Sequence, residues 1–310
     1  MKKMHPAFSL IEVIFVLVIL GIVASISSQI IVQVYENYVT QKALYNVNTK
    51  TELASTQIVN RLSHVIDETT IVKDPNYTTY TKADESVSWV RMKDIPADDN
   101  NFTIVEWIGY DNDSFAAGAT PYWTGLSDYE SATRQSFQTP GSQLTQAQTI
   151  IKNLSEGKVD LTSSYPAAVI FQQQNNLYRT GAEYDPACMG LIETNQTACI
   201  FRVSLNSDDN LSFEDNKTKI VTERYKLSWS AYALVPEENG PNDYNLSLYY
   251  NYQPWNQESY KDGQKELLIP HISVFKFTEN GGVIQLKLCA TQQIGEDFNI
   301  SSCKEKAIIR

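Results

Sequence analysis

Histidine is scarce in this chain of 310 residues, and its three copies, His5, His64 and His271, lie far apart in sequence. Zinc is commonly held by clustered imidazoles or thiolates, so this scarcity disfavours a multi-histidine metal site. Basic residues are also in deficit, because 25 lysines and arginines stand against 36 aspartates and glutamates, a formal net charge of −11. Nucleic-acid phosphates and acidic lipid head groups bind to positive surfaces, so the charge argues against both as direct partners.

Short enzyme signatures are missing as well. The sequence contains no G-x-S-x-G, no H-E-x-x-H and no phosphate-binding glycine loop. We therefore expect no catalytic residue and no enzymatic activity. The five tryptophans and 18 tyrosines suit strand surfaces and subunit contacts, with a carbohydrate site as an open alternative.

Charge is absent from one long segment near the N-terminus. Residues 13–35 form a run of 23 without a charged side chain, and as a helix this run spans about 35 Å, enough for a bilayer core. Lys2 and Lys3 precede it, which predicts that the N-terminus stays in the cytoplasm. Glu12 sits at the front of the apolar run, where a carboxylate in lipid costs about 2–3 kcal/mol or more. Such a group needs a partner, and the segment offers none, so we expect one from another chain or from a new amino terminus.

Residues 7–25, AFSLIEVIFVLVILGIVAS, resemble the N-terminus of type IV pilin-like proteins, which include pilins and pseudopilins. The resemblance implies that a prepilin peptidase removes residues 1–7 by cutting between Ala7 and Phe8, and that the same enzyme methylates the amino group of Phe8. Glu12 then becomes the fifth residue of the mature chain, where the family keeps its glutamate. Ser9, Leu10, Ile11 and Gly21 also match, whereas Ala7 replaces the usual glycine.

The same resemblance implies an assembly role for Glu12. In the family, this carboxylate is thought to meet the methylated ammonium of a neighbouring Phe8, which offsets part of the cost of each charge in an apolar core. The implied partners are the peptidase and methyltransferase, other pilins or pseudopilins, and an inner-membrane assembly platform. The implied location is the inner membrane, as a single pass with the C-terminal domain in the periplasm, and then a pilus or pseudopilus.

The length of the chain beyond the N-terminal helix indicates which kind of pilin-like protein the resemblance implies. A body of about 240 residues is large for a major pilin and indicates a minor subunit, similar to J-type pseudopilins of type II secretion and W-type minor pilins. Type II secretion, DNA uptake and type IV pili all use such subunits. Two alternatives remain open: a cleaved secretory signal with a site near Ser25, and an ordinary single-pass anchor. The latter would make the chain a membrane-anchored periplasmic binding protein outside any filament.

The helical pattern continues past the apolar run. Apolar or small residues recur at steps of three and four, which predicts one helix over residues 8–67 whose second half packs on a sheet, with a coiled coil as the alternative. The stripe consists of Leu44, Val47, Thr51, Ala54, Ile58, Leu62 and Val65.

Residues 68–310 read as one β-rich domain, so the expected fold class is α+β: a long N-terminal helix packed on antiparallel sheet. Runs of β-branched and aromatic residues predict strands over 87–92, 102–110, 168–172, 177–180, 199–204, 219–234 and 244–252. Turn residues predict connections at 175–176 and 237–241, and a hairpin over 271–290 that turns at 279–282. Residues 128–141 read as a long loop. A helix is expected over 142–156, with Ser142 or Thr145 as its cap and Gly157 at its end.

Four cysteines, Cys188, Cys199, Cys289 and Cys303, lie in the part expected to be exported. They allow three pairings, and closure of the shorter loops favours Cys188–Cys199 and Cys289–Cys303. A zinc site is the alternative, though no C-x2-C pair is present. No cofactor or metal is otherwise expected, except that Asp208, Asp209, Glu214 and Asp215 are candidates for a calcium loop without the D-x-D-x-D-G pattern.

Overall fold

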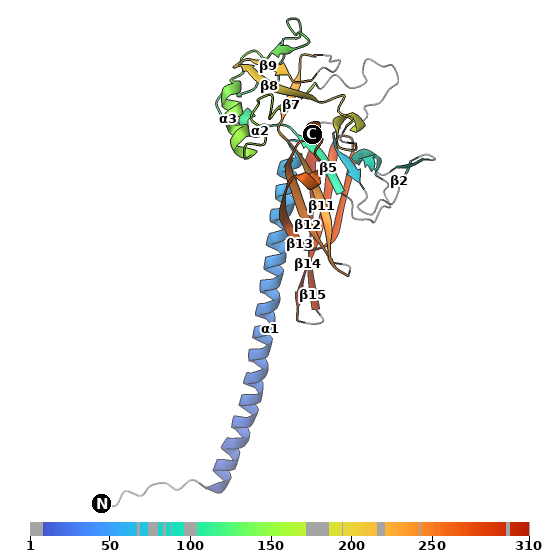
Figure 1. The fold of residues 1–310 in the computed structure, drawn as a ribbon. Coiled ribbons are helices and arrows are strands. Elements are labelled where there is room, and N and C mark those ends of the chain that lie inside the picture. Colours follow the sequence, from blue (N-terminus) through green and yellow to red (C-terminus); the bar gives the residue numbers. More distant parts are fainter. Residues whose placement is uncertain are drawn as a thin grey trace, which may run out of the picture. The chain divides into compact units, whose positions relative to one another are not determined.

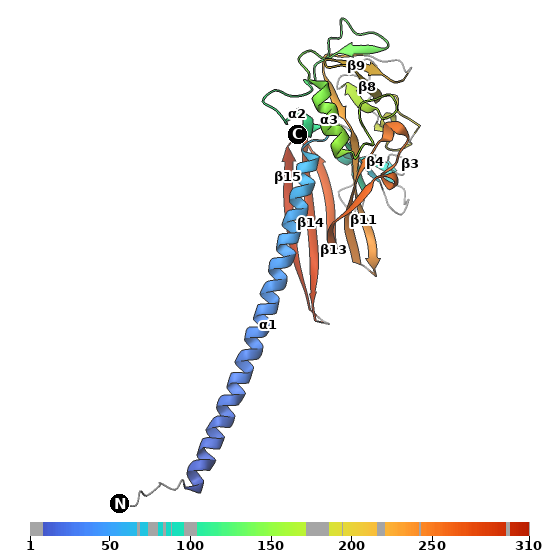
Figure 2. The same ribbon diagram turned by 60° about the vertical axis from the view of Figure 1, so that its left-hand side comes forward.

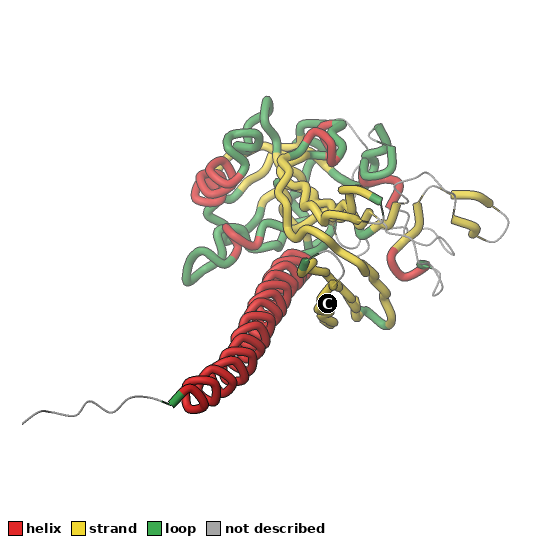
Figure 3. Tube along the Cα trace, turned by 90° about the horizontal axis from the view of Figure 1, so that it is seen from below, coloured by secondary structure: helices red, strands yellow, loops and turns green. Residues whose placement is uncertain are grey.

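The computed structural model describes residues 9–66, 69–73, 80–82, 85–87, 89–95, 104–171, 186–193, 195–215, 221–241, 243–295 and 298–309. The chain divides into two units, residues 1–49 with 291–302 and residues 50–290 with 303–310. Strands predominate in the described chain beyond the first helix (Figure 3). The expected α+β class is therefore confirmed.

Helix α1 runs without interruption from Leu10 to Leu62, 53 residues (Figure 1). No proline lies within it, so every residue after the first turn can donate an intrahelical hydrogen bond. Thr51, Ala54, Ile58 and Leu62 are all buried, as the stripe predicts. Leu44, which we expected on this stripe, is instead 48% exposed. The helix ends five residues before the predicted limit, because Ser63 and His64 form a turn.

The larger sheet has eight strands, and the strand pairs with a described register are antiparallel (Figures 1 and 2). Its order is β15 (Phe298–Ile309), β14 (Val283–Ile294), β13 (Gln264–Asn280), β12 (Asp243–Tyr252), β11 (Ser230–Gly240), β5 (Ile104–Gly109), β1 (Ile71–Lys73) and β4 (Trp89–Arg91). A separate two-stranded ribbon pairs β2 (Tyr80–Lys82) with β3 (Glu85–Val87).

The β13–β14 hairpin is tighter than the sequence predicts. Asn280 pairs with Val283, so the turn consists of Gly281 and Gly282 alone. Both have positive φ, 59° and 79°, which a two-residue turn of this kind requires and glycine adopts at no steric cost. The alternating apolar residues then meet across the strands, as Phe277 lies opposite Leu286.

The described residues between β5 and β11 build a second sheet of five strands. Its order is β10 (Tyr225–Ser228), β7 (Ala167–Phe171), β8 (Phe201–Ser207), β9 (Asn210–Phe213) and β6 (Ser136–Gln138). The five residues of β7 are all buried, because alternate side chains enter two different apolar clusters. Val169 and Phe171 pack in a cluster with helix α3 (Leu144–Leu154), whereas Ala168 and Ile170 pack with residues of β5 and β11. A single sheet thus joins two cores.

Short helical turns complete the chain: α2 (Asn112–Phe115), η1 (Met92–Asp94), η3 (Pro186–Met189), η4 (Pro254–Asn256) and η5 (Tyr260–Asp262). Two expected loops are shorter in the structure. The predicted loop 128–141 contains β6, which pairs with β9. The predicted connection 237–241 is largely strand, since β11 continues to Gly240 and Gly240 pairs with Asp243. Isolated turn residues misled the prediction, because cross-strand hydrogen bonds hold these segments extended. The strand expected at 177–180 and the turn at 175–176 lie outside the described residues.

Candidate membrane and assembly segment

The first turn of α1 is capped by Ser9. The backbone N–H of Glu12 donates to the Ser9 carbonyl at 3.1 Å and lies 3.4 Å from its Oγ, and the N–H of Val13 donates to the same carbonyl at 3.3 Å. Glu12 therefore occupies the third helical position, where the positive end of the helix dipole favours a carboxylate. No described cation lies within ion-pair distance of the Glu12 carboxylate.

The apolar part of α1 remains uncovered in the structure. Phe15 is 66% exposed and Leu17 63%, and none of the most apolar 18-residue window of the helix is buried. By length and composition α1 is the one described helix able to cross a membrane. A row of large exposed apolar side chains requires lipid or other protein around it, because water contact costs about 25 cal/mol per Å².

The residues expected to be processed lie next to this segment. Ala7 and Phe8 fall outside the described residues, so cleavage and methylation there stay predictions. Glu12 is described and lies in the first turn of the helix, and the assembly role expected for it stays a prediction.

All four cysteines form disulfides in the pairing that short loops favour. Cys188 and Cys199 have an S–S distance of 2.00 Å and Cα atoms 5.3 Å apart. Cys289 and Cys303 have an S–S distance of 2.10 Å and link β14 to β15. The zinc alternative is therefore not supported, because each thiol is consumed by a disulfide.

The structure does not bring the four candidate calcium residues together. Asp208 and Asp209 lie in the turn between β8 and β9, whereas Glu214 and Asp215 follow the far end of β9. Glu214 accepts a hydrogen bond from Ser204, and Asp215 accepts one from the backbone of Arg202 at 3.2 Å. Among the residues that the structure describes, there is no group of three or more histidine, cysteine, aspartate or glutamate side chains that could hold a metal ion. The β9 strand separates the two pairs, which the sequence alone did not indicate.

Two buried acids were missed by sequence reasoning. Glu106 is 1% exposed, and its carboxylate accepts from Lys73 Nζ at 2.5 Å and from the Tyr252 hydroxyl at 2.9 Å. Burial, and then the Glu106 charge, raise the pKa of Tyr252 well above its usual value. Asp111 accepts from the N–H of Ser114 at 3.2 Å at the start of α2, and burial raises the pKa of Asp111 to about 7. Neither Glu106 nor Asp111 belongs to a sequence motif that predicts a buried acid.

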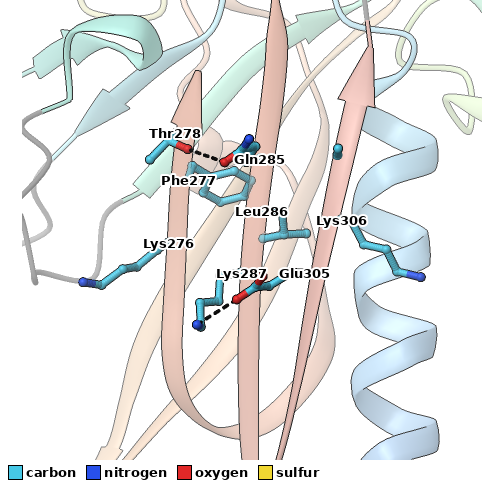
Figure 4. Close-up of a pocket in the computed structure, with 9 residues that line it drawn as sticks. Lys276, Phe277, Thr278, Gln285, Leu286, Lys287, Glu305 and Lys306 are labelled. Atoms are coloured by element: carbon cyan, nitrogen blue, oxygen red, sulfur yellow. Dashed lines mark hydrogen bonds and ion pairs between the residues drawn. The ribbon is translucent and has the colours of Figure 1, made fainter. Parts of the chain in front are cut away.

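A groove of about 440 Å³ crosses strands β13, β14 and β15 (Figure 4). Lys287 and Glu305 form an ion pair across it at 2.8 Å, and Thr278 lies 3.5 Å from Gln285 (Figure 4). Lys306, also at the groove, is paired with Glu52 of α1 at 2.5 Å, a contact that lowers the pKa of Glu52. These charges are satisfied within the chain, so the groove presents little unmatched charge to a ligand.

Comparison with known proteins gives one match. Residues 2–28 match a family model described as the prokaryotic N-terminal methylation motif. No curated protein and no solved structure matches the chain. The matched segment contains Ala7, Phe8 and Glu12 and leads into the apolar helix. The methylation motif and the long apolar helix together support a type IV pilin-like protein.

Proposed function

We propose that this chain is a minor pilin-like subunit that assembles into a type II secretion pseudopilus or a related type IV filament. The observation that carries the proposal is the methylation motif at residues 2–28 joined to a helix whose apolar side chains remain exposed. In this proposal, prepilin peptidase removes residues 1–7 and Phe8 is methylated. Before assembly the subunit resides in the inner membrane, with its N-terminus in the cytoplasm and its β-rich domain in the periplasm.

The physical driving force for assembly is the pairing of two buried charges. Glu12 has no cationic partner among the described residues, and a carboxylate in hydrocarbon is costly. The methylated ammonium of Phe8 from a neighbouring subunit supplies the missing charge, and the apolar helices then pack side by side. The chain acts as substrate of the processing enzyme and as a structural subunit, with no catalysis of its own.

Intact-mass spectrometry of the protein from native membranes tests the proposal. The expected mass is that of a chain starting at Phe8 with one added methyl group. A chain that retains residues 1–7, or that starts near Ser25, would contradict it and favour an ordinary anchor or a secretory signal. Cross-linking of the native protein through the β-rich domain, followed by identification of the neighbours, separates a filament subunit from a solitary membrane-anchored binding protein.

A further inference from the structure

A cavity of about 580 Å³ lies at the C-terminal end of α1, within the larger unit. Its walls come from the last turns of α1, the end of β5, helix α2, and strands β11 and β12. The volume is in the range of small-molecule sites, which is about 300–1,000 Å³. Nothing in the function proposed above uses this cavity.

The walls are held in place by hydrogen bonds between elements. The N–H of Ile66 donates to the Ile108 carbonyl at 2.9 Å, and the N–H of Tyr110 donates to the His64 carbonyl at 2.9 Å. The His64 ring Nδ1 lies 3.1 Å from the Tyr110 hydroxyl. These bonds hold the segment that follows α1 against the end of β5, so this side of the cavity is fixed by the fold itself.

Gly109 shows how closely the wall is packed. A Cβ atom at this position would lie 2.7 Å from Cε2 of Tyr232, which is closer than real side chains approach. The absence of a side chain lets the Tyr232 ring lie against the end of β5. The Tyr232 ring also stacks on Trp107, with centroids 5.7 Å apart and planes at 24°.

Two opposite charges line the cavity, and neither has an ion-pair partner among the described residues. The Arg61 guanidinium lies over the Tyr232 ring at 5.2 Å and over the Tyr250 ring at 5.9 Å, which orients its donors. Asp113 comes from α2 on another wall. Burial lowers the pKa of His64, which favours the neutral form of its ring.

Stacking of a flat or saccharide ligand is disfavoured, although aromatic residues surround the cavity. The Lys226 ammonium already lies 4.2 Å from the centre of the Tyr110 ring. The Tyr232 ring contacts both Trp107 and Arg61. The rings therefore act mainly through their edges and hydroxyl groups, and the charged groups dominate recognition.

We propose that this cavity binds a small zwitterion of the class of amino acids and dipeptides. Arg61 binds the ligand carboxylate through two parallel N–H donors, a geometry that a guanidinium favours. Asp113 accepts hydrogen bonds from the ligand ammonium group. The side-chain amides of Asn60 and Asn112, which also line the cavity, form hydrogen bonds with the polar groups of the ligand that lie between its two charges.

Calorimetric titration of the full-length protein in detergent micelles with alanylglutamine tests this proposal. Binding is expected for the free dipeptide, and it should weaken on the order of tenfold or more when the amine is acetylated or the carboxylate is amidated. Arg61→Gln and Asp113→Asn should each weaken binding by a similar factor, and Arg61→Lys should recover part of it. Matched controls are Arg134→Gln and Glu130→Gln, exposed residues that do not line the cavity.

Three results would overturn the proposal. The first is no binding of the free dipeptide up to about 10 mM. The second is equal binding of the blocked and free dipeptides, which would show that the ligand's ammonium and carboxylate groups do not contribute to binding. The third is unchanged binding by Arg61→Gln or Asp113→Asn when circular dichroism shows an unchanged fold. Unchanged affinity in a variant of lowered thermal stability would overturn the proposal as well, because that residue would then act on the fold alone.

Discussion

The Oδ1 atom of Asp208 accepts a hydrogen bond from the backbone N–H of Thr145 at 2.9 Å. The carbonyl of Asp208 also accepts from the N–H of Leu144 at 2.9 Å. The β8–β9 turn therefore caps helix α3 from a distance of about 60 residues in sequence. Ser142, the expected cap, instead accepts from the N–H of Thr124 at 3.0 Å. The helix ends at Leu154 with Ser155 as its C-cap, and Glu156, with a φ of 55°, takes the left-handed position before the expected Gly157.

Replacing Asp208 by alanine should lower the free energy of unfolding by about 1 kcal/mol, because the Thr145 N–H would lose its partner while the Leu144 N–H keeps the backbone carbonyl. Asp209→Ala is the matched control, since its carboxylate contacts only the exposed Ser207 hydroxyl among the described groups. Thermal unfolding of the full chain measures both. Equal losses would contradict the capping role, and a calcium-dependent rise of melting temperature that Asp208→Ala abolishes would restore the calcium-loop hypothesis.

Removal of the Lys73 charge should destabilise the domain strongly. Lys73→Met leaves the Glu106 carboxylate buried without its ammonium, which typically costs about 3–5 kcal/mol. It also removes the donor to the Leu191 carbonyl, inside the Cys188–Cys199 loop. Adding Glu106→Gln to Lys73→Met should recover much of the loss, as denaturant unfolding would show.

A surface pair supplies the control for that experiment. Lys152 and Asp160 lie 3.6 Å apart, and the Lys152 side chain is 59% exposed. Lys152→Met should therefore change stability by less than about 1 kcal/mol. If Lys73→Met proved as mild as Lys152→Met, the buried pair would contribute far less than its burial implies.

Opening either disulfide should lower stability. The closed loops separate the paired cysteines by 11 and 14 positions, and each is worth about 3 kcal/mol in the chain-entropy treatment. Cys289→Ala with Cys303→Ala should loosen the middle of β15 around residue 303, detected as faster amide exchange there. Non-reducing peptide mapping checks the connectivity first. A crossed Cys188–Cys289 link would contradict the structure.

Asp111 should make stability depend on pH. Burial raises the pKa of Asp111 to about 7, so the folded chain holds this proton more tightly than the unfolded chain does. The stabilisation is complete below about pH 4 and is lost as the pH rises through about 7, an effect of about 4 kcal/mol at 1.36 kcal/mol per pKa unit.

The variant Asp111→Asn isolates this effect, because the amide oxygen can still accept from Ser114. The melting temperature of the variant minus that of the wild type should be larger at about pH 8 than at about pH 5. Ionisation of Asp111 at the higher pH destabilises only the wild type. Differential scanning calorimetry at both pH values measures the difference. A difference independent of pH would show that Asp111 does not titrate in this range.

Glu12→Gln tests the proposed assembly contact. The variant should still insert in the membrane, lose residues 1–7 and gain the methyl group, because the apolar run is unchanged. Recovery of the subunit in sheared filaments should fall by on the order of tenfold or more, since the charge partner for Phe8 is gone. Glu36→Gln, just beyond the apolar run, is the matched control. Normal incorporation of Glu12→Gln would refute the docking role.

Local signals in the sequence determined the N-terminal helix and its methylation motif. The charge-free run, the position of Glu12 and the absence of proline between Pro6 and Pro75 act through neighbouring residues alone. The helix α1 and the methylation motif could therefore be predicted without knowledge of the fold. The β13–β14 hairpin was foreseeable for the same reason, because adjacent glycines favour a two-residue turn wherever they occur.

Tertiary structure decided the rest, because its contacts join residues far apart in sequence. The cap that Asp208 gives to α3 and the Lys73–Glu106 pair depend on which strands become neighbours. So does the approach of Arg61 to Tyr232, which places a guanidinium at the cavity. Composition gives no sign of these pairs, since an aspartate, lysine or arginine on the surface looks the same in sequence as one turned inward.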